Sequence, residues 1–302
     1  MIEPWIVCSF LYVITKYGYP PPPEQTAAHL AEMKALDFQS VELEGIRREH
    51  LLAVYDRRHE LADQVRQLEL AVPYFCIVLP GLASASGLER EQNLQLFRQG
   101  CEVASLLGAT GVLDNAPLPP YIFPDDIPIV RHFDEEVLQA GTLPRDLAWS
   151  AYWVDLVTTY RTACDIAGEF GLTYNLHPCL GVLAATTEGF LYFRDAVKRD
   201  NLRFTPDTAN QFVQKDNLAL SLRRLAGCLD YIHLSDNRGK QVEHLAPEQG
   251  AINWDIFFET LDLIGFKGRI GIDVGGAESG VVDLEEAYRQ TAAWLAGRWE
   301  LS

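Results

Sequence analysis

Four polar side chains end apolar segments in the second half of the sequence. They are His177 in LTYNLHP, Asp207 in LRFTPDTAN, His233 in YIHLSDN and Asp273 in RIGIDVG. Two carboxylates buried together are costly without a cation, and two imidazoles with two carboxylates suit one divalent ion. Mixed nitrogen and oxygen ligands favour Mn²⁺, Co²⁺, Zn²⁺ or Fe²⁺. We predict one ion at these residues, with Mn²⁺ expected first and Mg²⁺ also compatible.

Each of the four residues also has an ordinary structural interpretation. A single histidine at the end of a strand is usually a hydrogen-bonded packing residue, and a single aspartate there is usually a helix cap. The four residues, however, end four consecutive predicted strands, and each occupies a position where an apolar run would otherwise continue. That pattern favours a shared site over four unrelated structural roles.

Eight short apolar runs recur along the chain, and a longer stretch with helical spacing follows each one. The runs are residues 5–12, 40–45, 72–81, 111–117, 172–178, 202–210, 231–237 and 269–275. Brief apolar runs are typical of parallel strands buried on both faces. No GxGxxG or GxxxxGK motif follows the first run, which disfavours an open nucleotide-binding sheet. The alternation predicts an α/β fold, a (β/α)8 TIM barrel with residues 1–302 in a single domain.

The stretches between the runs carry helix signals. Apolar residues recur every three or four positions in three of these stretches. The three sets are Leu94, Phe97, Cys101 and Ala104; Trp149, Trp153, Leu156, Tyr160 and Ala163; and Trp254, Phe257, Leu261 and Ile264. Such spacing places apolar side chains on one side of a helix. Ser86 with Glu89, and Asp283 with Glu286, have the spacing of capping boxes and predict helix starts.

The segment 116–146 makes the connection from the fourth to the fifth predicted strand unusually long. It is rich in proline and aromatic residues. A long loop after a barrel strand lies at the C-terminal end of the barrel, where active sites occur. We therefore predict an inserted loop over the mouth of the barrel; a surface excursion or an oligomer contact is the alternative.

The net charge and the cysteine content limit the kinds of binding partner and the cellular compartment that we expect. The net charge is −17, and the acidic residues are scattered rather than gathered in a tail. Such a surface repels phosphate backbones and anionic lipid, so no nucleic acid or membrane partner is expected. Six cysteines occur singly without a CxxC motif, and the N-terminal apolar run lacks a basic flank, which predicts reduced thiols in a cytoplasmic protein. A homo-oligomer or a role as a partner subunit remains open.

The last third of the sequence resembles the sugar phosphate isomerase/epimerase superfamily, whose barrel is xylose-isomerase-like. DYIHLSDNRG (230–239) is similar to its strand-seven motif, in which the histidine is a metal ligand. HLAPEQGAINWDIFFETLDLIGFKGRIGID (244–273), FTPDTAN (204–210) and LHPCLGV (176–182) resemble neighbouring motifs of ketose 3-epimerases and inosose dehydratases. The resemblance implies a metal-dependent enzyme for a sugar, keto-sugar or cyclitol. Seven histidines and an acidic surface disfavour the endonuclease IV branch.

The sequence departs from the family pattern at three places. His177-Pro178 stands where the epimerases have a ligand glutamate before proline, Asn210 stands where a histidine is usual, and Asp273 replaces a glutamate. Ligand character is kept at all four metal positions. The glutamate pair that transfers protons in the epimerases is not kept.

Several residues follow as candidates for catalysis and substrate binding. We expect catalysis from His177 or Asp273, with Glu44 as an outer candidate, since Glu42 and Glu44 share one face of the second strand. Substrate contacts are expected from Asp114, Asn210, Arg238 and Trp5. The predicted reaction is isomerisation or epimerisation after proton abstraction next to a carbonyl. A lyase or dehydratase using β-elimination is one alternative, and a non-catalytic carbohydrate-binding or partner subunit is another.

Overall fold

Parallel strands form at all eight predicted positions. The computed structural model describes residues 1–124 and 133–299. The strands are β1 (Ile6–Cys8), β2 (Ser40–Val41), β3 (Leu43–Ile46), β4 (Tyr74–Val78), β5 (Gly111–Asn115), β6 (Thr173–His177), β7 (Leu202–Phe204), β8 (Tyr231–Leu234) and β9 (Arg269–Ile272). The second predicted strand appears as two pieces, β2 and β3, which Glu42 separates.

The strands close into a barrel. One sheet has the order β2-β1-β9-β8 and the other has the order β3-β4-β5-β6-β7, with every pairing parallel. The two sheets continue into each other through Glu42 on one side. On the other side, single bridges join Phe204 to Leu229 and Asp207 to His233. The predicted (β/α)8 barrel is therefore confirmed.

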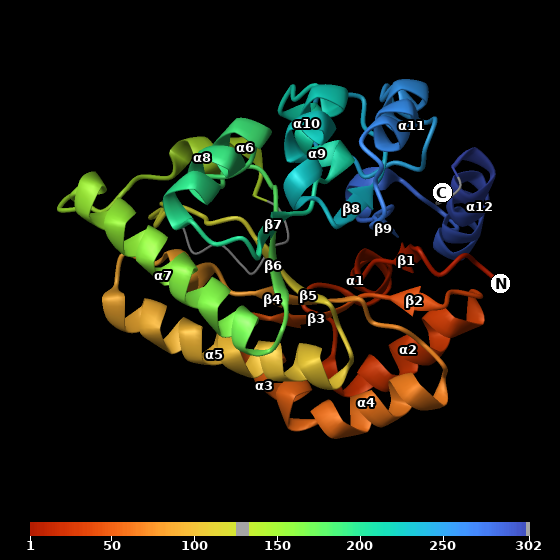
Figure 1. The fold of residues 1–302 in the computed structure, drawn as a ribbon, viewed down its shortest axis with the longest axis horizontal. Helices are drawn as coiled ribbons and strands as arrows, with labels where there is room; N and C mark the ends of the chain where they lie inside the picture. The colour runs from red at the N-terminus through yellow and green to blue at the C-terminus, as the bar shows by residue number, and fades with distance from the viewer. Residues whose placement is uncertain (125–132, 300–302) are drawn as a thin grey trace.

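Helices surround the strands, as Figure 1 shows. They are α1 (Leu11–Tyr17), α2 (Thr26–Ala35), α3 (Arg47–Asp56), α4 (Arg58–Gln67), α5 (Gly87–Leu106), α6 (Glu135–Ala140), α7 (Trp149–Glu169), α8 (Thr187–Val197), α9 (Thr208–Val213), α10 (Leu218–Leu225), α11 (Trp254–Leu263) and α12 (Leu284–Arg298). Short 3-10 turns occur at Pro23–Gln25, Pro80–Ala83, Ala226–Cys228 and Ala277–Ser279.

The predicted helix starts and faces hold with one exception. Ser86 accepts a hydrogen bond from the amide of Glu89 at 3.4 Å, and Asp283 accepts one from the amide of Glu286 at 3.0 Å. Each cap satisfies an amide that has no partner within its helix. The exception is Trp149, whose side chain is exposed because it begins α7 beyond the packed part of the helix.

A small apolar layer fills the barrel below its mouth. Its members are Val7, Tyr74, Cys76, Leu113 and Tyr231. The rings of Tyr74 and Tyr231 stack with centroids 4.3 Å apart. Gly271 of β9 leaves the room that the Tyr231 hydroxyl needs, since any side chain there would overlap it. This layer closes the bottom of the mouth and excludes a pore through the barrel.

The segment 116–146 contains regular structure in its described part. Residues 125–132 lie outside the described residues. Glu135–Ala140 forms α6, which starts with two acidic residues that favour a helix N-terminus. Ile122 and Thr142 pair through two backbone hydrogen bonds of 2.7 and 2.9 Å. Leu138 of α6 packs against Gly181, so the insertion contacts the loop that follows β6.

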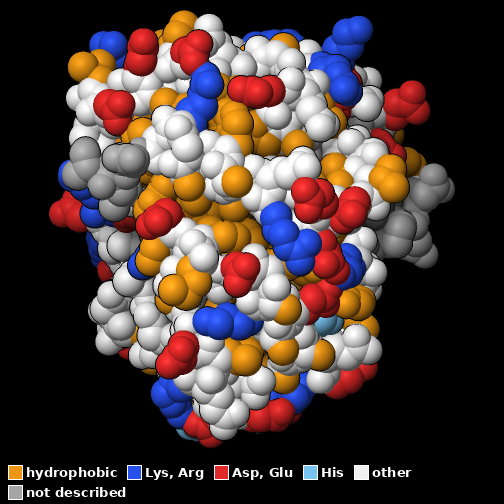
Figure 2. All heavy atoms as spheres, turned by 90° about the vertical axis from the view of Figure 1, so that its right-hand side faces the viewer, with side chains coloured by type: hydrophobic (Ala, Val, Ile, Leu, Met, Phe, Trp, Pro, Cys, Tyr) orange, Lys and Arg blue, Asp and Glu red, His pale blue; other side chains and the backbone are white. Residues whose placement is uncertain are grey.

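The distribution of charged side chains on the surface and the burial of the cysteines agree with what the composition predicts. On the face in Figure 2, Lys and Arg side chains are interspersed with Asp and Glu and form no basic strip. Five of the six cysteines are buried, and Cys179 is partly exposed. Within the described part of the chain, no helix is both long enough and apolar enough to cross a bilayer.

We predict that the chain unfolds in one cooperative transition, because both sheets share the interior of one barrel. Thermal unfolding followed by far-UV circular dichroism and by tryptophan fluorescence should give coincident curves. Two separated transitions would contradict the prediction of a single domain.

Candidate metal centre

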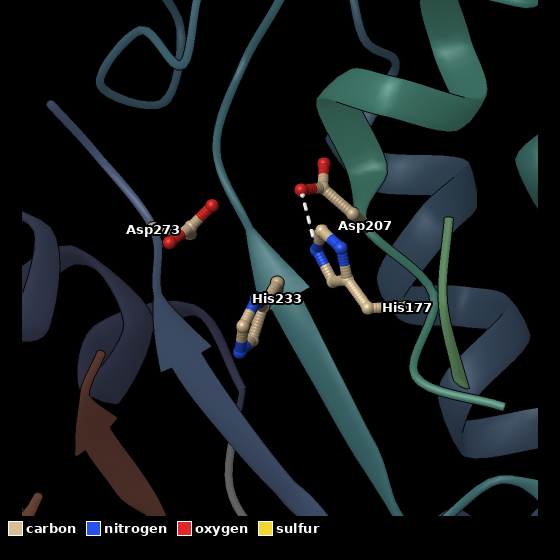
Figure 3. Close-up of side chains that lie close together, drawn as sticks. All are labelled: His177, Asp207, His233 and Asp273. Atoms are coloured by element: carbon tan, nitrogen blue, oxygen red, sulfur yellow. Dashed lines mark hydrogen bonds and ion pairs between the residues drawn. The ribbon is translucent and has the colours of Figure 1, made fainter. Parts of the chain in front are cut away.

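The four predicted ligands lie together at the mouth of the barrel. His177 is the last residue of β6, Asp207 follows β7, His233 belongs to β8 and Asp273 follows β9. One ligand atom from each lies within 4.8 Å of the others. Figure 3 shows the four side chains close together, with His177 in contact with Asp207. The carboxyl ends of parallel strands meet at one rim, which brings these distant residues together.

Asp207 is held in place from two directions. It caps α9, because its Oδ1 accepts a hydrogen bond from the Asn210 amide at 2.8 Å, and its Oδ2 accepts one from Asn210 Nδ2 at 2.7 Å. His177 Nε2 lies 3.0 Å from the same Oδ2. Burial alone would raise the pKa of Asp207, but contacts with His177 and His244 hold it well below its usual range. Asp207 is therefore a carboxylate at neutral pH.

The structure places Asn210, a predicted substrate contact, behind Asp207. Its side chain is fully buried and lies against Asp207, and it is not among the residues that line the open space. Asn210 instead orients a predicted ligand. Carboxylates at metal sites are commonly fixed by such outer hydrogen bonds.

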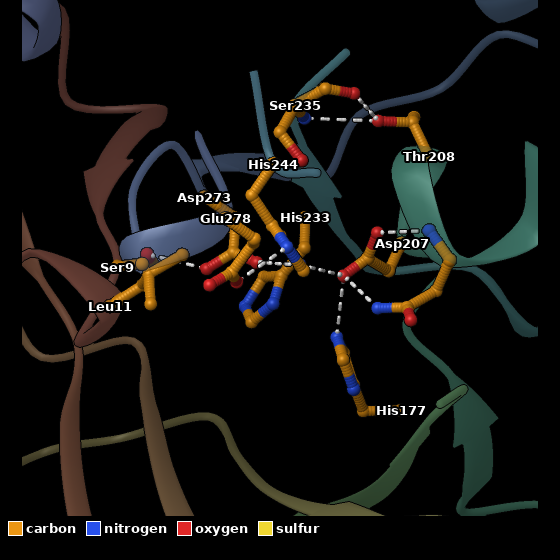
Figure 4. A network of polar contacts seen from close by, with 12 residues as sticks. Ser9, Leu11, His177, Asp207, Thr208, His233, Ser235, His244, Asp273 and Glu278 are labelled. Atoms are coloured by element: carbon orange, nitrogen blue, oxygen red, sulfur yellow. Dashed lines mark hydrogen bonds and ion pairs between the residues drawn. The ribbon is translucent and has the colours of Figure 1, made fainter. Parts of the chain in front are cut away.

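A third histidine, His244, lies between the two aspartates. Its Nε2 is 3.5 Å from Asp207 Oδ2 and 3.4 Å from Asp273 Oδ2, and its Nδ1 is 3.3 Å from Glu278 Oε1. Ser9 donates a hydrogen bond of 2.9 Å to the other oxygen of Asp273. Figure 4 shows this network. Sequence reasoning missed His244 because it lies in the loop from β8 to α11, where no periodicity marks an inward side chain.

Glu42 supports His233 from below. His233 Nε2 lies 3.0 Å from Glu42 Oε2, the Tyr231 hydroxyl donates to the same oxygen at 3.0 Å, and the Phe10 amide donates to Oε1 at 3.3 Å. Burial acts to lower the pKa of His233, but the charges of Glu42 and Asp273 raise it to about 9. Since Nε2 is engaged, Nδ1 is the ring nitrogen left for an ion. The alternation of Glu42 with Glu44 was the sequence signal for this residue.

The donor set fits a divalent ion. Two buried carboxylates and two imidazoles converge, and other polar groups fix three of them: Glu42 behind His233, Asn210 behind Asp207 and Ser9 behind Asp273. Metal sites combine ligands with such supporting partners. A second group, Glu42, Glu44 and Cys76, also has ligand atoms within 4.8 Å. Burial raises the pKa of the Cys76 thiol, which disfavours a thiolate ligand there.

An open space lies in front of the four residues. On the opposite wall, Glu44 of β3 and Asp114 of β5 line the same space as His177, His233 and Asp273. Asp114 is 2% exposed and accepts hydrogen bonds from the Leu79 amide at 3.3 Å and the Tyr174 hydroxyl at 3.2 Å. Burial raises the pKa of Asp114 to about 8, and these bonds offset only part of that effect. Asp114 is therefore largely protonated at pH 7.

The predictions for Trp5 and Arg238 as substrate contacts are corrected. Trp5 precedes β1, at the N-terminal end of the barrel opposite the mouth, and packs edge-to-face on Trp299 with ring centroids 5.1 Å apart. Arg238 pairs with Glu243 at 2.7 Å, and its side chain is 57% exposed. Neither residue lines the open space in front of the four ligands.

We predict about one divalent ion per chain, lost with EDTA together with several degrees of melting temperature. Ligand at 100 times its dissociation constant stabilises a protein by about 2.7 kcal/mol. His177→Ala should weaken binding and His177→Glu should restore it, whereas His59→Ala, at an exposed position on α4, should leave it unchanged. The measurement is elemental analysis with thermal melts. His177→Ala protein that binds metal as tightly as wild type would make His177 a packing residue.

We also predict that Asp114 makes folding stability fall as pH rises. Its folded-state pKa of about 8 exceeds the unfolded value, so the folded chain holds the proton more tightly. The stability that this proton contributes is present below about pH 4 and is lost up to about pH 8, by at most about 1.4 kcal/mol per pH unit. Urea unfolding in EDTA should show a shallower pH dependence for Asp114→Asn. Parallel curves for variant and wild type would contradict this assignment.

Solved structures with a similar fold include two sugar epimerases. D-psicose 3-epimerase from Clostridium cellulolyticum H10 superimposes with a TM-score of 0.71 at 15% identity over 99% of this chain and 100% of that one. The 3-keto-D-glucoside 4-epimerase of E. coli gives 0.71 at 17% identity over 98% and 100%. An IolI protein with a bound zinc atom gives 0.67 at 18% identity over 97% and 96%. At these identities the likeness shows the fold.

Sequence comparison identifies the family. An uncharacterised protein of Methanocaldococcus jannaschii is 28% identical over 146 residues, which are 45% of this chain and 49% of the relative. The chain thus matches about half the length of that curated relative. Residues 30–298 match the model of the xylose isomerase-like TIM barrel. With nearly its whole length matched, the chain belongs to the xylose isomerase-like TIM barrel family.

Proposed function

We propose that the protein is a divalent-metal-dependent isomerase or epimerase that acts on a sugar, a keto-sugar or a cyclitol. The observation that carries the proposal is the convergence of His177, Asp207, His233 and Asp273 at a mouth whose opposite wall holds Glu44 and Asp114. The similar solved structures, which include two sugar epimerases, support a carbohydrate substrate. We expect Mn²⁺ as the ion. The free thiols support a reducing, cytoplasmic setting.

In this proposal, the ion and the residues that hold it would stabilise negative charge on the substrate. A divalent ion bound by the four ligands would polarise a substrate carbonyl and stabilise the negative charge that forms when a neighbouring proton leaves. Asp207 and Asp273 supply the charge that attracts the ion, and Glu42 and Asn210 keep two of the ligands oriented. His177 in place of a glutamate leaves the ion with a higher net charge, which strengthens this polarisation.

Proton transfer belongs to the opposite wall in this proposal. His177 and Asp273 serve as ligands, and Asp273 already contacts Ser9 and His244, so we assign them no proton transfer. Glu44 is placed to take the proton next to the carbonyl. Asp114 is largely protonated at pH 7 and is placed to return one. Return to the same carbon from the other face gives epimerisation, and return to the neighbouring carbon gives isomerisation.

One observation favours β-elimination as a second candidate. The epimerase glutamate pair is missing, while Asp114 keeps a proton at the mouth. In this reaction Glu44 takes the proton next to the carbonyl, a C–O bond at the β carbon breaks, and the departing alkoxide takes the proton of Asp114. The products are an enone and an alcohol or water. The same residues therefore serve either reaction, and the product distinguishes them.

The test is a panel of ketohexoses, inososes and 3-keto-glucosides incubated with metal-loaded protein in D₂O. We predict deuterium at the carbon next to the carbonyl of at least one compound, read by NMR. Glu44→Gln should reduce the exchange at least about 100-fold, the scale of general base catalysis, with unchanged metal content. Glu259→Gln, at an exposed position on α11, is the matched control and should exchange like wild type.

The outcomes separate the alternatives. An epimer or isomer supports the first proposal, and an enone with a released alcohol supports the second. Stoichiometric metal without exchange on any compound would contradict both and leave a non-catalytic carbohydrate-binding or partner subunit.

A further inference from the structure

A second cavity adjoins the open space in front of the metal ligands. The two spaces share five lining residues: Tyr19, Val78, Asp114, Asn115 and Cys179. Cys179 lies two residues beyond His177, and Asp114 belongs to β5, the strand that pairs with the strand of His177. Because their walls are shared, a molecule bound at the mouth can extend from one space into the other.

The two spaces differ in chemical character. The first is lined by the acidic and histidine side chains Glu42, Glu44, His177, His233 and Asp273, together with apolar side chains such as Leu11, Ile14 and Leu113. Beyond the shared residues, the second cavity is lined mainly by apolar and aromatic side chains: Pro80, Ala116, Leu118, Phe133, Tyr160, Leu180 and Val182. Arg47 is the charged residue among these additional lining residues.

Backbone bonds fix the apolar walls to the strand that carries His177. The Ala116 amide donates to the His177 carbonyl at 2.9 Å, and the Leu183 amide donates to the Pro117 carbonyl at 2.9 Å. Tyr160 of α7 is 1% exposed and packs edge-to-face on Phe193 with ring centroids 5.1 Å apart. The cavity is therefore built into the same framework as the metal centre. Preformed apolar pockets with few polar groups are typical ligand sites.

We propose that this cavity is a subsite for an apolar aglycone, so that the substrate is a keto-glycoside with an aromatic or aliphatic aglycone on its sugar. The proposal rests on the proposed function, which places the sugar at the metal centre. The hydroxyl and carbonyl groups then face the ligands, and the aglycone contacts Leu118, Leu180 and Val182. Asp114 lies on the shared wall, where the glycosidic oxygen would pass between the two spaces.

The experiment compares two keto-glucosides that differ only in the aglycone. Phenyl and methyl 3-keto-β-D-glucosides, which keep the carbonyl, are titrated by calorimetry into metal-loaded Glu44→Gln protein, so that binding is measured without turnover. Burial of the ring should make the phenyl keto-glucoside bind at least about tenfold more tightly. Leu180→Asp and Leu180→Trp, which charge and fill the subsite, should each bring phenyl affinity to the methyl level and leave methyl affinity unchanged. Leu220→Asp is the control, because Leu220 is 55% exposed on α10.

Metal content and melting temperature of each variant establish that it is folded. Equal affinities of the protein with Leu180 intact for the two keto-glucosides, or no detectable binding of the phenyl keto-glucoside at millimolar concentration, would overturn the subsite. Variants that keep the tenfold preference would also overturn it. The result is independent of catalysis: a phenyl preference without exchange in D₂O would contradict the proposed enzyme activity and keep the subsite.

Discussion

Two carboxylates, Asp207 and Asp273, are buried at the mouth of the barrel, and the surrounding residues compensate the negative charge that they carry. Buried like charges are costly unless positive groups or hydrogen-bond donors accompany them. His177, His233 and His244 surround the pair, and Ser9 and Asn210 donate to it. An apolar pair at these places would have needed none of these partners. The arrangement is compatible with the proposed cation, and the histidines balance part of the negative charge.

In the proposed mechanism, metal binding and proton transfer are assigned to residues on different strands. Strands β6 to β9 bring the predicted ligands to one side of the mouth, and β3 and β5 bring Glu44 and Asp114 to the other. The layer around Tyr74 and Tyr231 closes the space from below. A substrate held between the two walls would present its carbonyl to one side and the adjacent C–H bond to the other. Leu118 and Phe133, from the long connection after β5, line the adjoining cavity that we propose for the aglycone of a keto-glycoside.

Sequence patterns within single segments predicted the strands and the residues that end them. Strand positions followed from short apolar runs, and the four ligands followed because each one ends such a run. His244 and Ser9 escaped because they lie in connections, where only the closed barrel reveals which side chains point inward. Trp5 was misplaced because an aromatic residue beside a strand does not by itself indicate which end of the barrel it occupies. Arg238 was misjudged because its nearby partner Glu243 satisfies its charge.

The most direct test of the central claim is crystallography of Mn²⁺-soaked protein with diffraction data collected at the manganese absorption edge. The account predicts one anomalous peak per chain, in contact with His177, Asp207, His233 and Asp273, with His233 using Nδ1 while Nε2 keeps its bond to Glu42. A peak elsewhere would contradict it. So would a crystal soaked at saturating Mn²⁺ in which no ion lies between the four side chains and His177 still pairs with Asp207.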